Sequence, residues 1–257
     1  MRITFLGTAT SIGVPVIGCD CSVCQSDDPR NNRLRSSIHV QTDDHAWVVD
    51  TGPDFRTQCL RENIRHLDAV LYTHAHMDHV VGFDDLRRFT FGADAELPIY
   101  GTADCLADLR RMFAFAFNGE NRYIGYIKPK PVEIEGPFTL GSTTVTPLPV
   151  EHGKVTTIGF LFVPANGKRI AYISDCKRLH PEAEALVQDV DVLVVDALRF
   201  REHPTHLNFD EALALREAVG ARQTWFTHFS CEVDHEKAQA ALPKGVALAY
   251  DGLKLDL

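Results

Sequence analysis

The sequence predicts an α/β fold in which two β-sheets pack face to face and helices cover their outer faces. Short apolar runs typical of strands dominate the first third of the chain. Strand-like and helix-like stretches alternate in the last third, as in βαβ units. No linker or repeat divides the 257 residues, so we expect a single domain spanning residues 1–257.

The expected strands are rich in Val, Ile, Leu or aromatic residues and are bounded by Gly, Asp or Thr. The chain begins with expected strands at 2–6, 37–42, 46–50 and 69–73, followed by a helix at 80–89, a strand at 97–100 and a helix at 103–115. Four strands follow, at 138–140, 143–147, 157–163 and 169–174. The alternating part consists of a strand at 192–195, a helix at 209–219, a strand at 223–227, a helix at 235–242 and a strand at 246–250.

Composition excludes several classes of protein. With 45% hydrophobic and 24% charged residues the chain is too apolar for a disordered protein. No apolar run approaches the roughly 20 residues that a membrane span needs, and the N-terminal stretch lacks the apolar core of a signal peptide. The net charge of −9 argues against a protein that coats nucleic acid or anionic lipid with its whole surface. We therefore expect a cytoplasmic protein without a membrane partner.

One segment does not fit a core pattern, because it mixes aromatic and basic side chains. Either it is an amphipathic helix with a surface loop, or residues 102–136 form a lid over an anionic ligand, with aromatic walls and basic contacts. The side chains concerned are Phe113, Phe115, Phe117, Tyr123, Tyr126, Arg110, Arg111, Arg122, Lys128 and Lys130.

Three histidines and one aspartate lie within six residues, directly after a strand-like run. His74 and His76 are two residues apart, so both point to one side of an extended backbone. Asp78 and His79 follow where a helix begins, and they can reach a neighbouring point a few Å away. Imidazole and carboxylate together suit zinc, manganese or iron. The sequence therefore predicts a metal site at this strand end.

Three other strand ends carry similar residues, namely His152, Asp175 and His228. Taken alone, each is more often a capping or turn residue than a ligand. Together with the first group they supply seven ligands, enough for two metals bridged by a carboxylate.

The run from Thr73 to His79 resembles the HxHxDH signature of the metallo-β-lactamase superfamily, and the later residues follow in the order that this superfamily uses. The resemblance covers essentially the whole chain. It implies an αββα sandwich of two mixed sheets with a dinuclear site at one edge. In that arrangement one metal is held by His74, His76 and His152, the other by Asp78, His79 and His228, with Asp175 between them and Asp50 orienting a ligand imidazole.

Three cysteines within six residues, Cys19, Cys21 and Cys24, form a CxCxxC cluster. In a chain without an export signal such a cluster indicates a metal site rather than disulfides. It is similar to the cluster in phosphodiesterases of the carbon–phosphorus lyase pathway, the PhnP family, which complete the site with a histidine three residues after the last active-site histidine. Here Cys231 stands at that place. The resemblance thus implies one structural zinc bound by four thiolates.

His206 lies just before an expected helix, where a histidine is ordinarily a capping or surface residue. PhnP proteins and the tRNA 3′-processing endonuclease carry a catalytic histidine at the corresponding place. The resemblance therefore implies that His206 is catalytic, acting on the departing oxygen without binding metal.

The resemblance implies a dinuclear metal-dependent phosphodiesterase that hydrolyses a small or cyclic phosphodiester, similar to a 5-phosphoribosyl 1,2-cyclic phosphate. A hydroxide between two Mn or Zn ions would attack phosphorus, and Asp78 would orient it as well as bind metal. The expected partner is a small anionic substrate rather than nucleic acid, with a homodimer as one assembly state. Three alternatives stay open: a tRNA 3′-processing endonuclease, a PqqB-like protein of cofactor biosynthesis, and a scaffold that uses metal only for stability.

Overall fold

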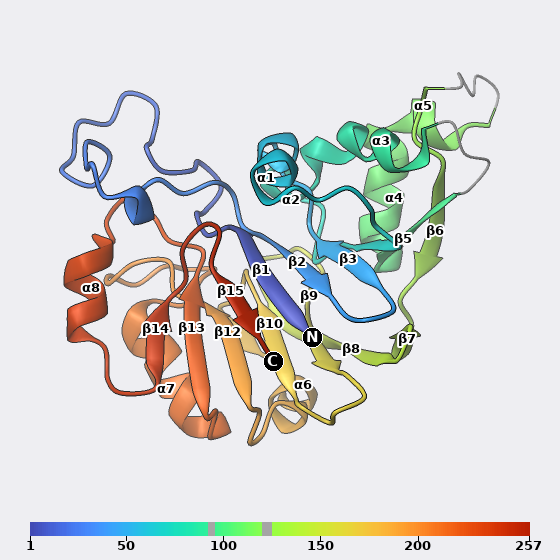
Figure 1. Cartoon of the computed structure of the whole chain (residues 1–257). Coiled ribbons are helices and arrows are strands. Elements are labelled where there is room, and N and C mark those ends of the chain that lie inside the picture. Colours follow the sequence, from blue (N-terminus) through green and yellow to red (C-terminus); the bar gives the residue numbers. More distant parts are fainter. Residues whose placement is uncertain (92–95, 120–124) are drawn as a thin grey trace.

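The computed structural model describes residues 1–91, 96–119 and 125–257, and it shows the predicted αββα sandwich. Two mixed sheets pack face to face, with helices on both outer faces (Figure 1). No helix in the described part of the chain is both long enough and apolar enough to cross a membrane.

The first sheet has seven strands, and its two halves differ in direction. In spatial order the strands are β15 (Lys254–Asp256), β1 (Arg2–Gly7), β2 (Ser37–Gln41), β3 (Ala46–Val49), β4 (Ala69–Leu71), β5 (Leu97–Gly101) and β6 (Pro129–Glu133). The half that contains both chain ends is antiparallel, from β15 to β3. The other half, from β3 to β6, is parallel.

The second sheet repeats this plan with an antiparallel half followed by a parallel half. It has eight strands, of which β7 (Phe138–Leu140) pairs with β8 outside the main order. That order is β11 (Arg178–Leu179), β8 (Thr143–Glu151), β9 (Thr157–Val163), β10 (Ile170–Ile173), β12 (Val192–Asp196), β13 (Gln223–Thr227) and β14 (Val246–Leu248).

The helices form two layers, one on each sheet. The first layer contains α1 (Phe55–Glu62), α2 (Met77–Val80), η2 (Val81–Leu86), α3 (Arg87–Thr90), α4 (Ala103–Met112) and α5 (Ala114–Phe117). The second contains α6 (Pro181–Leu186), α7 (Phe209–Val219) and α8 (His235–Ala241). A short 3-10 helix, η1 (Pro29–Asn31), lies in the long loop after β1.

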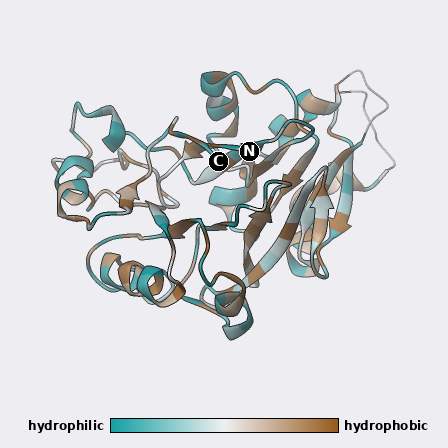
Figure 2. Ribbon diagram, turned by 60° about the horizontal axis from the view of Figure 1, so that its bottom comes forward, coloured by the Kyte–Doolittle hydropathy of each residue, from teal (hydrophilic) through white to brown (hydrophobic). Residues whose placement is uncertain are grey.

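Alternation along the strands builds three apolar layers. On β3, Trp47 and Val49 face the second sheet, whereas Val48 faces the helices that contain Phe55 and Leu106. Both faces are therefore buried, which is why these strands read as nearly continuous apolar runs. Figure 2 shows hydrophobic residues concentrated on the strands, with both kinds of residue on the helices. Burying each such large side chain stabilises the fold by about 1.5–3 kcal/mol.

Several predicted boundaries are wrong. The helix expected at 80–89 is a series of three short helices, α2, η2 and α3. It starts at Met77, earlier than expected, and changes to 3-10 geometry at Val81, next to Gly82, whose backbone packs against that of Gly52. The helix expected at 103–115 breaks at Phe113, which separates α4 from α5.

Other elements were not predicted at all, chiefly α1, α6, β6, β11 and β15. Helix α1 buries only Phe55 and Gln58, so it lacks a clear apolar stripe. Strand β6 contains Pro129 and Pro131, which are tolerated because β6 is the edge of the first sheet.

The segment at 102–136 begins and ends within the fold. Helix α4 buries Leu106 and Leu109 in the first helical layer, and β6 pairs with β5. The rings of Phe113 and Phe117 stack on Phe83 with centroids 4.6 and 5.6 Å away. Arg122 and Tyr123 lie outside the described residues. A lid function for the stretch between α5 and β6 stays a prediction.

Candidate metal centre and active site

The candidate site lies where the parallel halves of both sheets end. Parallel strands place their carboxyl ends at the same edge of a sheet. The pairing register then determines which residues of neighbouring strands lie side by side. Val49 pairs with Leu71 in the first sheet, so Asp50 lies beside the loop that contains the histidine motif. Ile173, Val195 and Phe226 align in the second sheet. This register brings three residues at the strand ends close together: Asp175, Asp196 and His228.

One group of donors consists of His74, His76 and His152, whose ligand atoms all lie within 4.8 Å of one another. The Nε2 of His74 is 2.8 Å from Nδ1 of His76, which is 3.3 Å from Nε2 of His152. His74 and His152 are buried, but His76 is exposed. The group is therefore open to solvent on the side of His76.

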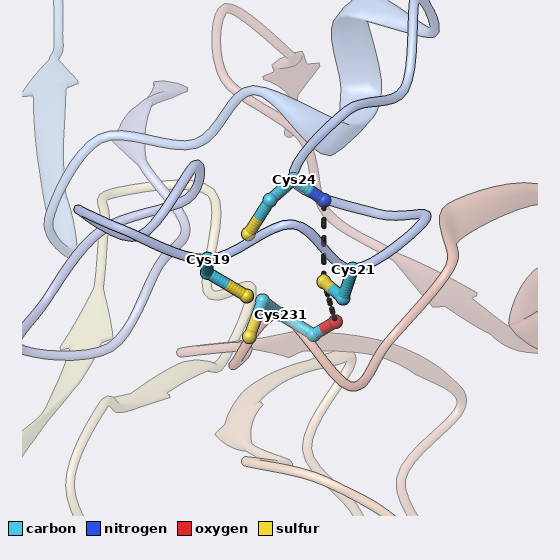
Figure 3. Close-up of side chains that lie close together, drawn as sticks. All are labelled: Cys19, Cys21, Cys24 and Cys231. Atoms are coloured by element: carbon cyan, nitrogen blue, oxygen red, sulfur yellow. Dashed lines mark hydrogen bonds between the residues drawn. The ribbon is translucent and has the colours of Figure 1, made fainter.

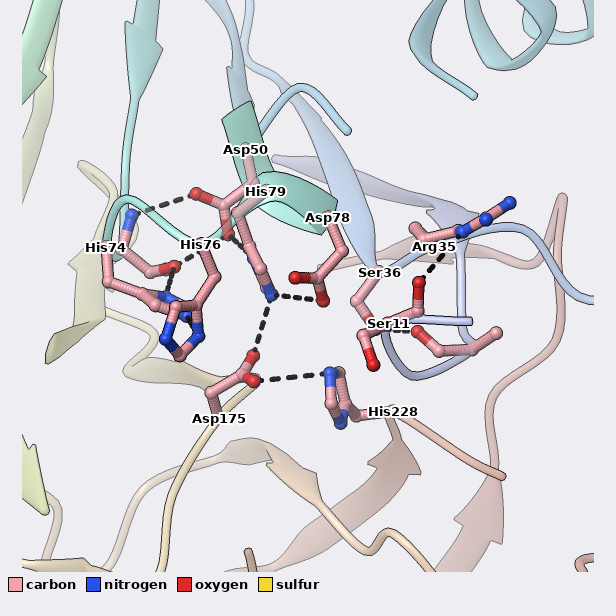
Figure 4. Close-up of polar contacts among 12 residues, drawn as sticks. Ser11, Arg35, Ser36, Asp50, His74, His76, Asp78, His79, Asp175 and His228 are labelled. Carbon is pink, nitrogen blue, oxygen red and sulfur yellow. Dashed lines mark hydrogen bonds and ion pairs between the residues drawn. The ribbon is translucent and has the colours of Figure 1, made fainter. Parts of the chain in front are cut away.

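The second group consists of Asp78, His79 and His228, again within 4.8 Å of one another. Asp175 lies against it and toward the first group (Figure 4). The two Asp175 oxygens are each 3.2 Å from a second-group imidazole, Oδ2 from Nε2 of His79 and Oδ1 from Nε2 of His228. Oδ1 is also 3.9 Å from Nε2 of His152. The structure thus brings together all seven predicted ligands, with Asp175 between the two groups.

These residues fit divalent metal ions. His79 Nε2, His228 Nε2 and Asp175 Oδ2 are buried and have no hydrogen-bond partner among the described residues. Buried polar atoms rarely stay unpartnered, and nitrogen and oxygen donors at this spacing suit Zn²⁺ or Mn²⁺. Burial lowers the pKa of His228 to about 3 and holds that of His74 well below its ordinary value. Both imidazoles are therefore neutral and able to bind metal at pH 7.

The charge of the site also favours a cation. Burial alone lowers the pKa of His79, but the carboxylates of Asp175, Asp78 and Asp50 reverse this effect and raise it well above its ordinary value. Three carboxylates around one buried imidazole create a negative potential that a proton or a metal ion would neutralise.

Asp50 lies behind the candidate metal ligands. Its Oδ2 accepts a hydrogen bond from Nδ1 of His79 at 2.7 Å, which directs Nε2 of that ring toward Asp175. Thr73 donates its backbone N–H to Oδ1 and its hydroxyl to Oδ2. Asp50 and His228 both have left-handed backbone conformations, with φ of 64° and 65°. Such conformations are costly for residues other than glycine and tend to occur at functional sites.

His206 lies beside the same groups, with its Nδ1 4.0 Å from Oδ1 of Asp175. Its ring is 4.7 Å from that of His152 and 4.9 Å from that of His228. Because of this proximity His206, His152 and Asp175 also form a group that could hold a metal ion. The non-ligand role of His206 stays a prediction.

Asp196 is a site residue that our reading of the sequence missed. Its Oδ2 is 2.7 Å from Nδ1 of His206 and also accepts the N–H of Cys176. Burial lowers the pKa of His206, but the charge and hydrogen bond of Asp196 outweigh burial and raise it. Its position in the sequence could have revealed it. Asp196 is the last residue of a buried strand, and Asp50 and Asp175 likewise lie just after buried strands.

The loop that contains the histidine motif is packed tightly against its neighbours. Gly52 lies so close to the backbone of Asp78 that a Cβ atom would overlap the Asp78 carbonyl oxygen. A Cβ on Gly82 would likewise overlap the carbonyl oxygen of Gly52. Thr51 adds hydrogen bonds to both sides, since its N–H donates to the carbonyl of His79 and its own carbonyl accepts from Gly82. Three backbone segments are thus in direct contact beneath the metal ligands.

The four predicted cysteines also come together, and their sulfur atoms all lie within 4.8 Å of one another (Figure 3). All four are free thiols. Backbone amides donate to two of the sulfurs, from Val16 to Cys24 and from Cys24 to Cys21. Four sulfurs at this spacing fit one tetrahedral metal ion, typically structural Zn²⁺, with no position open for substrate.

A buried arginine joins the same two segments. Arg33 is 1% exposed, and it donates to the backbone carbonyls of Ser230 and Val233. Its guanidinium lies 5.2 Å from the centre of the ring of Phe229. Phe229 directly follows His228 and precedes Cys231 by two residues. The cysteine cluster and Arg33 together attach the N-terminal loop to the segment that follows His228.

Comparison with known proteins agrees with this site. The family model of the beta-lactamase superfamily domain matches residues 45–229. A crystal structure described as a new diphosphatase from the PhnP family is 38% identical, with a TM-score of 0.91, over 99% of this chain and 97% of that one. Zn²⁺-bound PqqB from Methylobacterium extorquens is 25% identical, with a TM-score of 0.79, and each chain is covered completely.

A curated relative, an octanoyltransferase of Porphyromonas gingivalis, is 34% identical over 99% of this chain. The alignment covers 51% of that protein, so the chain spans about half of its length. The family model covers more than half of the chain, and the PhnP-family structure matches it from end to end. The predicted family is confirmed: the chain belongs to the metallo-β-lactamase superfamily and, within it, is a metallo-hydrolase of the PhnP family.

Proposed function

We propose that the chain is a phosphodiesterase that hydrolyses a small or cyclic phosphodiester. The observation that supports this proposal most is the hydrogen bond between His206 and Asp196. It places the His206 ring next to Asp175, which lies between the two donor groups. An ester releases an alkoxide, which is a poor leaving group unless a proton reaches it. A histidine whose proton is stabilised by a buried carboxylate is suited to supply that proton.

Two divalent ions bound by the seven ligands would lower the pKa of water and neutralise negative charge on the phosphoryl oxygens. The protein's own residues would do the rest. Asp78 belongs to the second donor group, and its carboxylate would also orient the attacking water by accepting a hydrogen bond. Asp196 would keep Nδ1 of His206 protonated, leaving Nε2 to donate to the departing oxygen. Exposed His76 marks the side from which substrate would enter.

The charge of the chain supports a small substrate. A long polyanion is gripped by many cationic contacts over an extended surface, but the chain has a net charge of −9. For this reason we rank the tRNA 3′-processing endonuclease lower. We also propose a homodimer as one assembly state, which the proposed reaction does not require.

The second candidate reaction is hydrolysis of a diphosphate, because the 38% identical relative is described as a diphosphatase. The two reactions make different demands on the leaving group. A phosphate leaves as a stable anion and gains little from a proton donor, whereas an alkoxide gains much. The buried pair of Asp196 and His206 therefore favours the ester.

The test is hydrolysis by protein loaded with Mn²⁺ or Zn²⁺. The substrates are bis-(p-nitrophenyl) phosphate, a ribosyl 1,2-cyclic phosphate, a 2′,3′-cyclic nucleotide, a nucleoside diphosphate and a tRNA precursor. We expect turnover of the cyclic or small diesters, with the highest kcat/KM on one of them. Preference for the diphosphate would establish the second candidate, and cleavage of the tRNA precursor alone would establish the endonuclease. Metal uptake without turnover of any of these would favour the scaffold or a PqqB-like role.

A further inference from the structure

A separate cavity lies on the outer helical layer, between α1 and the helices η2 and α3, and it shares no residue with the metal centre. Its volume is about 870 Å³, within the roughly 300–1,000 Å³ typical of small-molecule sites. Part of its wall is apolar and is formed by Phe55, Cys59, Ile64 and Phe89. The cavity is thus large enough for a small ligand and has walls that suit an apolar part of one.

The rim of this cavity is basic although the chain as a whole is acidic. Among the described residues that line it are four arginines, Arg56, Arg65, Arg87 and Arg88, and one aspartate, Asp85. Arg87 pairs with Asp84 at 3.5 Å, and Arg65 donates to the amide oxygen of Asn63.

The other two arginines have no such partner. Among the described residues Arg56 and Arg88 form no ion pair within 4.0 Å. Guanidinium groups match the geometry of phosphate oxygens and bind them in a bidentate way. Arg56 still acts electrostatically on Asp85. The rim therefore offers two arginines that no close ion pair neutralises.

Exposed apolar side chains lie at the same place. Leu60 is 64% exposed and Phe91 is 57% exposed, and both line the cavity. Arg88 lies 5.7 Å from the centre of the Phe91 ring, so a positive group and an accessible aromatic face adjoin one another. Aromatic rings of this kind stack on nucleobases, and arginine adds to the attraction.

We propose that this cavity is a second ligand site, for a small phosphorylated molecule with a flat aromatic body, such as a nucleoside monophosphate. Arg56 and Arg88 bind the phosphate, and the base stacks against Phe91. The enclosing helices favour a small ligand over a polymer, which would need a longer basic surface. This site is independent of the reaction proposed above.

The probe is adenosine 5′-monophosphate, a monoester that the proposed phosphodiesterase does not consume. Calorimetry on metal-loaded protein should detect its binding, with inorganic phosphate binding more weakly and adenosine more weakly still. The variant R56S/R88S should weaken binding at least about tenfold, because it removes the charge-assisted hydrogen bonds to the phosphate. The matched control K168S/K244S removes the same charge from exposed positions elsewhere and should bind as the wild type does. Phe91→Ser should weaken the nucleotide but not inorganic phosphate.

Location is tested separately, by hydrogen–deuterium exchange with and without the nucleotide. We expect protection in α1 and α3, and circular dichroism should show that all variants are folded. Three outcomes would overturn the proposal: no binding at millimolar nucleotide, protection confined to residues 74–79 and the other metal-site loops, or equal weakening by R56S/R88S and K168S/K244S. If phosphate binds as tightly as the nucleotide, the aromatic part of the proposal is wrong.

Discussion

The two sheets share one plan, an antiparallel half followed by a parallel half, but they deliver residues to the metal centre differently. The first sheet places His74, His76, Asp78 and His79 on one continuous segment after β4, which consists of a loop and the first residues of α2. The second sheet delivers Asp175, Asp196 and His228 from the ends of three separate strands, β10, β12 and β13.

This difference determines what holds each residue in place. Loop residues are positioned by local backbone contacts, such as those beneath Asp78. Residues from separate strands are positioned by the pairing of β10 with β12 and of β12 with β13. Each donor group also takes members from both sheets. Neither sheet alone contains a complete set, so the centre forms only when the two sheets pack together.

Asp175→Ala should have the largest effect. Asp175 follows β10 of the second sheet, and its carboxylate lies near both donor groups. We expect both metals to be lost or weakly held, with kcat falling beyond the roughly 10²–10⁴-fold that losing an acid–base group alone causes. Turnover and metal analysis measure this. Asp210→Ala, at an exposed position of α7, is the control. Retention of both metals with near-normal turnover would contradict the position of Asp175 between the metals.

His206→Ala should come next, because we propose His206 as a proton donor rather than a ligand. We expect full metal content and a loss in kcat of about 10²–10⁴-fold on esters with poor leaving groups. The loss should be smaller on p-nitrophenyl esters, whose leaving group needs little protonation. Equal losses on both kinds of ester would favour a role in holding the phosphate. Loss of one metal would make His206 a ligand.

Asp50→Asn tests the first sheet in a comparable way, since Asp50 supports His79 as Asp196 supports His206. Asparagine tolerates the left-handed backbone of this position, so the change reports on the hydrogen bond. Metal affinity or activity should fall about 10–100-fold. Asp68→Asn is the control, because that carboxylate accepts the N–H of Ala46 at the opposite end of β3. An unchanged affinity would mean that the loop alone orients His79.

Cys231→Ser should change turnover least and stability most. It removes one thiolate from the cluster that attaches the N-terminal loop to the segment after His228. One metal per chain should be lost, and Tm should fall by about 2–4 °C for each kcal/mol of stability lost. Cys59→Ser, at a partly buried cysteine outside the cluster, should keep the metal. Finding only two metals per chain in loaded, reduced wild type would contradict a separate structural site.

The same contrast explains what could be predicted from the sequence. The loop motif is contiguous, so spacing alone indicated a metal site. Asp196 was missed because nothing near it in the sequence shows that it faces His206, and that contact depends on strand register. Strand β6 was missed because its prolines disfavour a strand except at an edge, and edge position is a property of the whole sheet.

The contact of Gly52 with Asp78, and of Gly82 with Gly52, limits how this scaffold can diversify. In a library of variants with any residue at these two positions, only glycine should survive selection for activity, because even alanine would push the metal loop away. Exposed positions beside the site, such as Lys154, should accept substitution far more readily. New substrate preferences would therefore arise from the rim, while the loop beneath the metals stays the same.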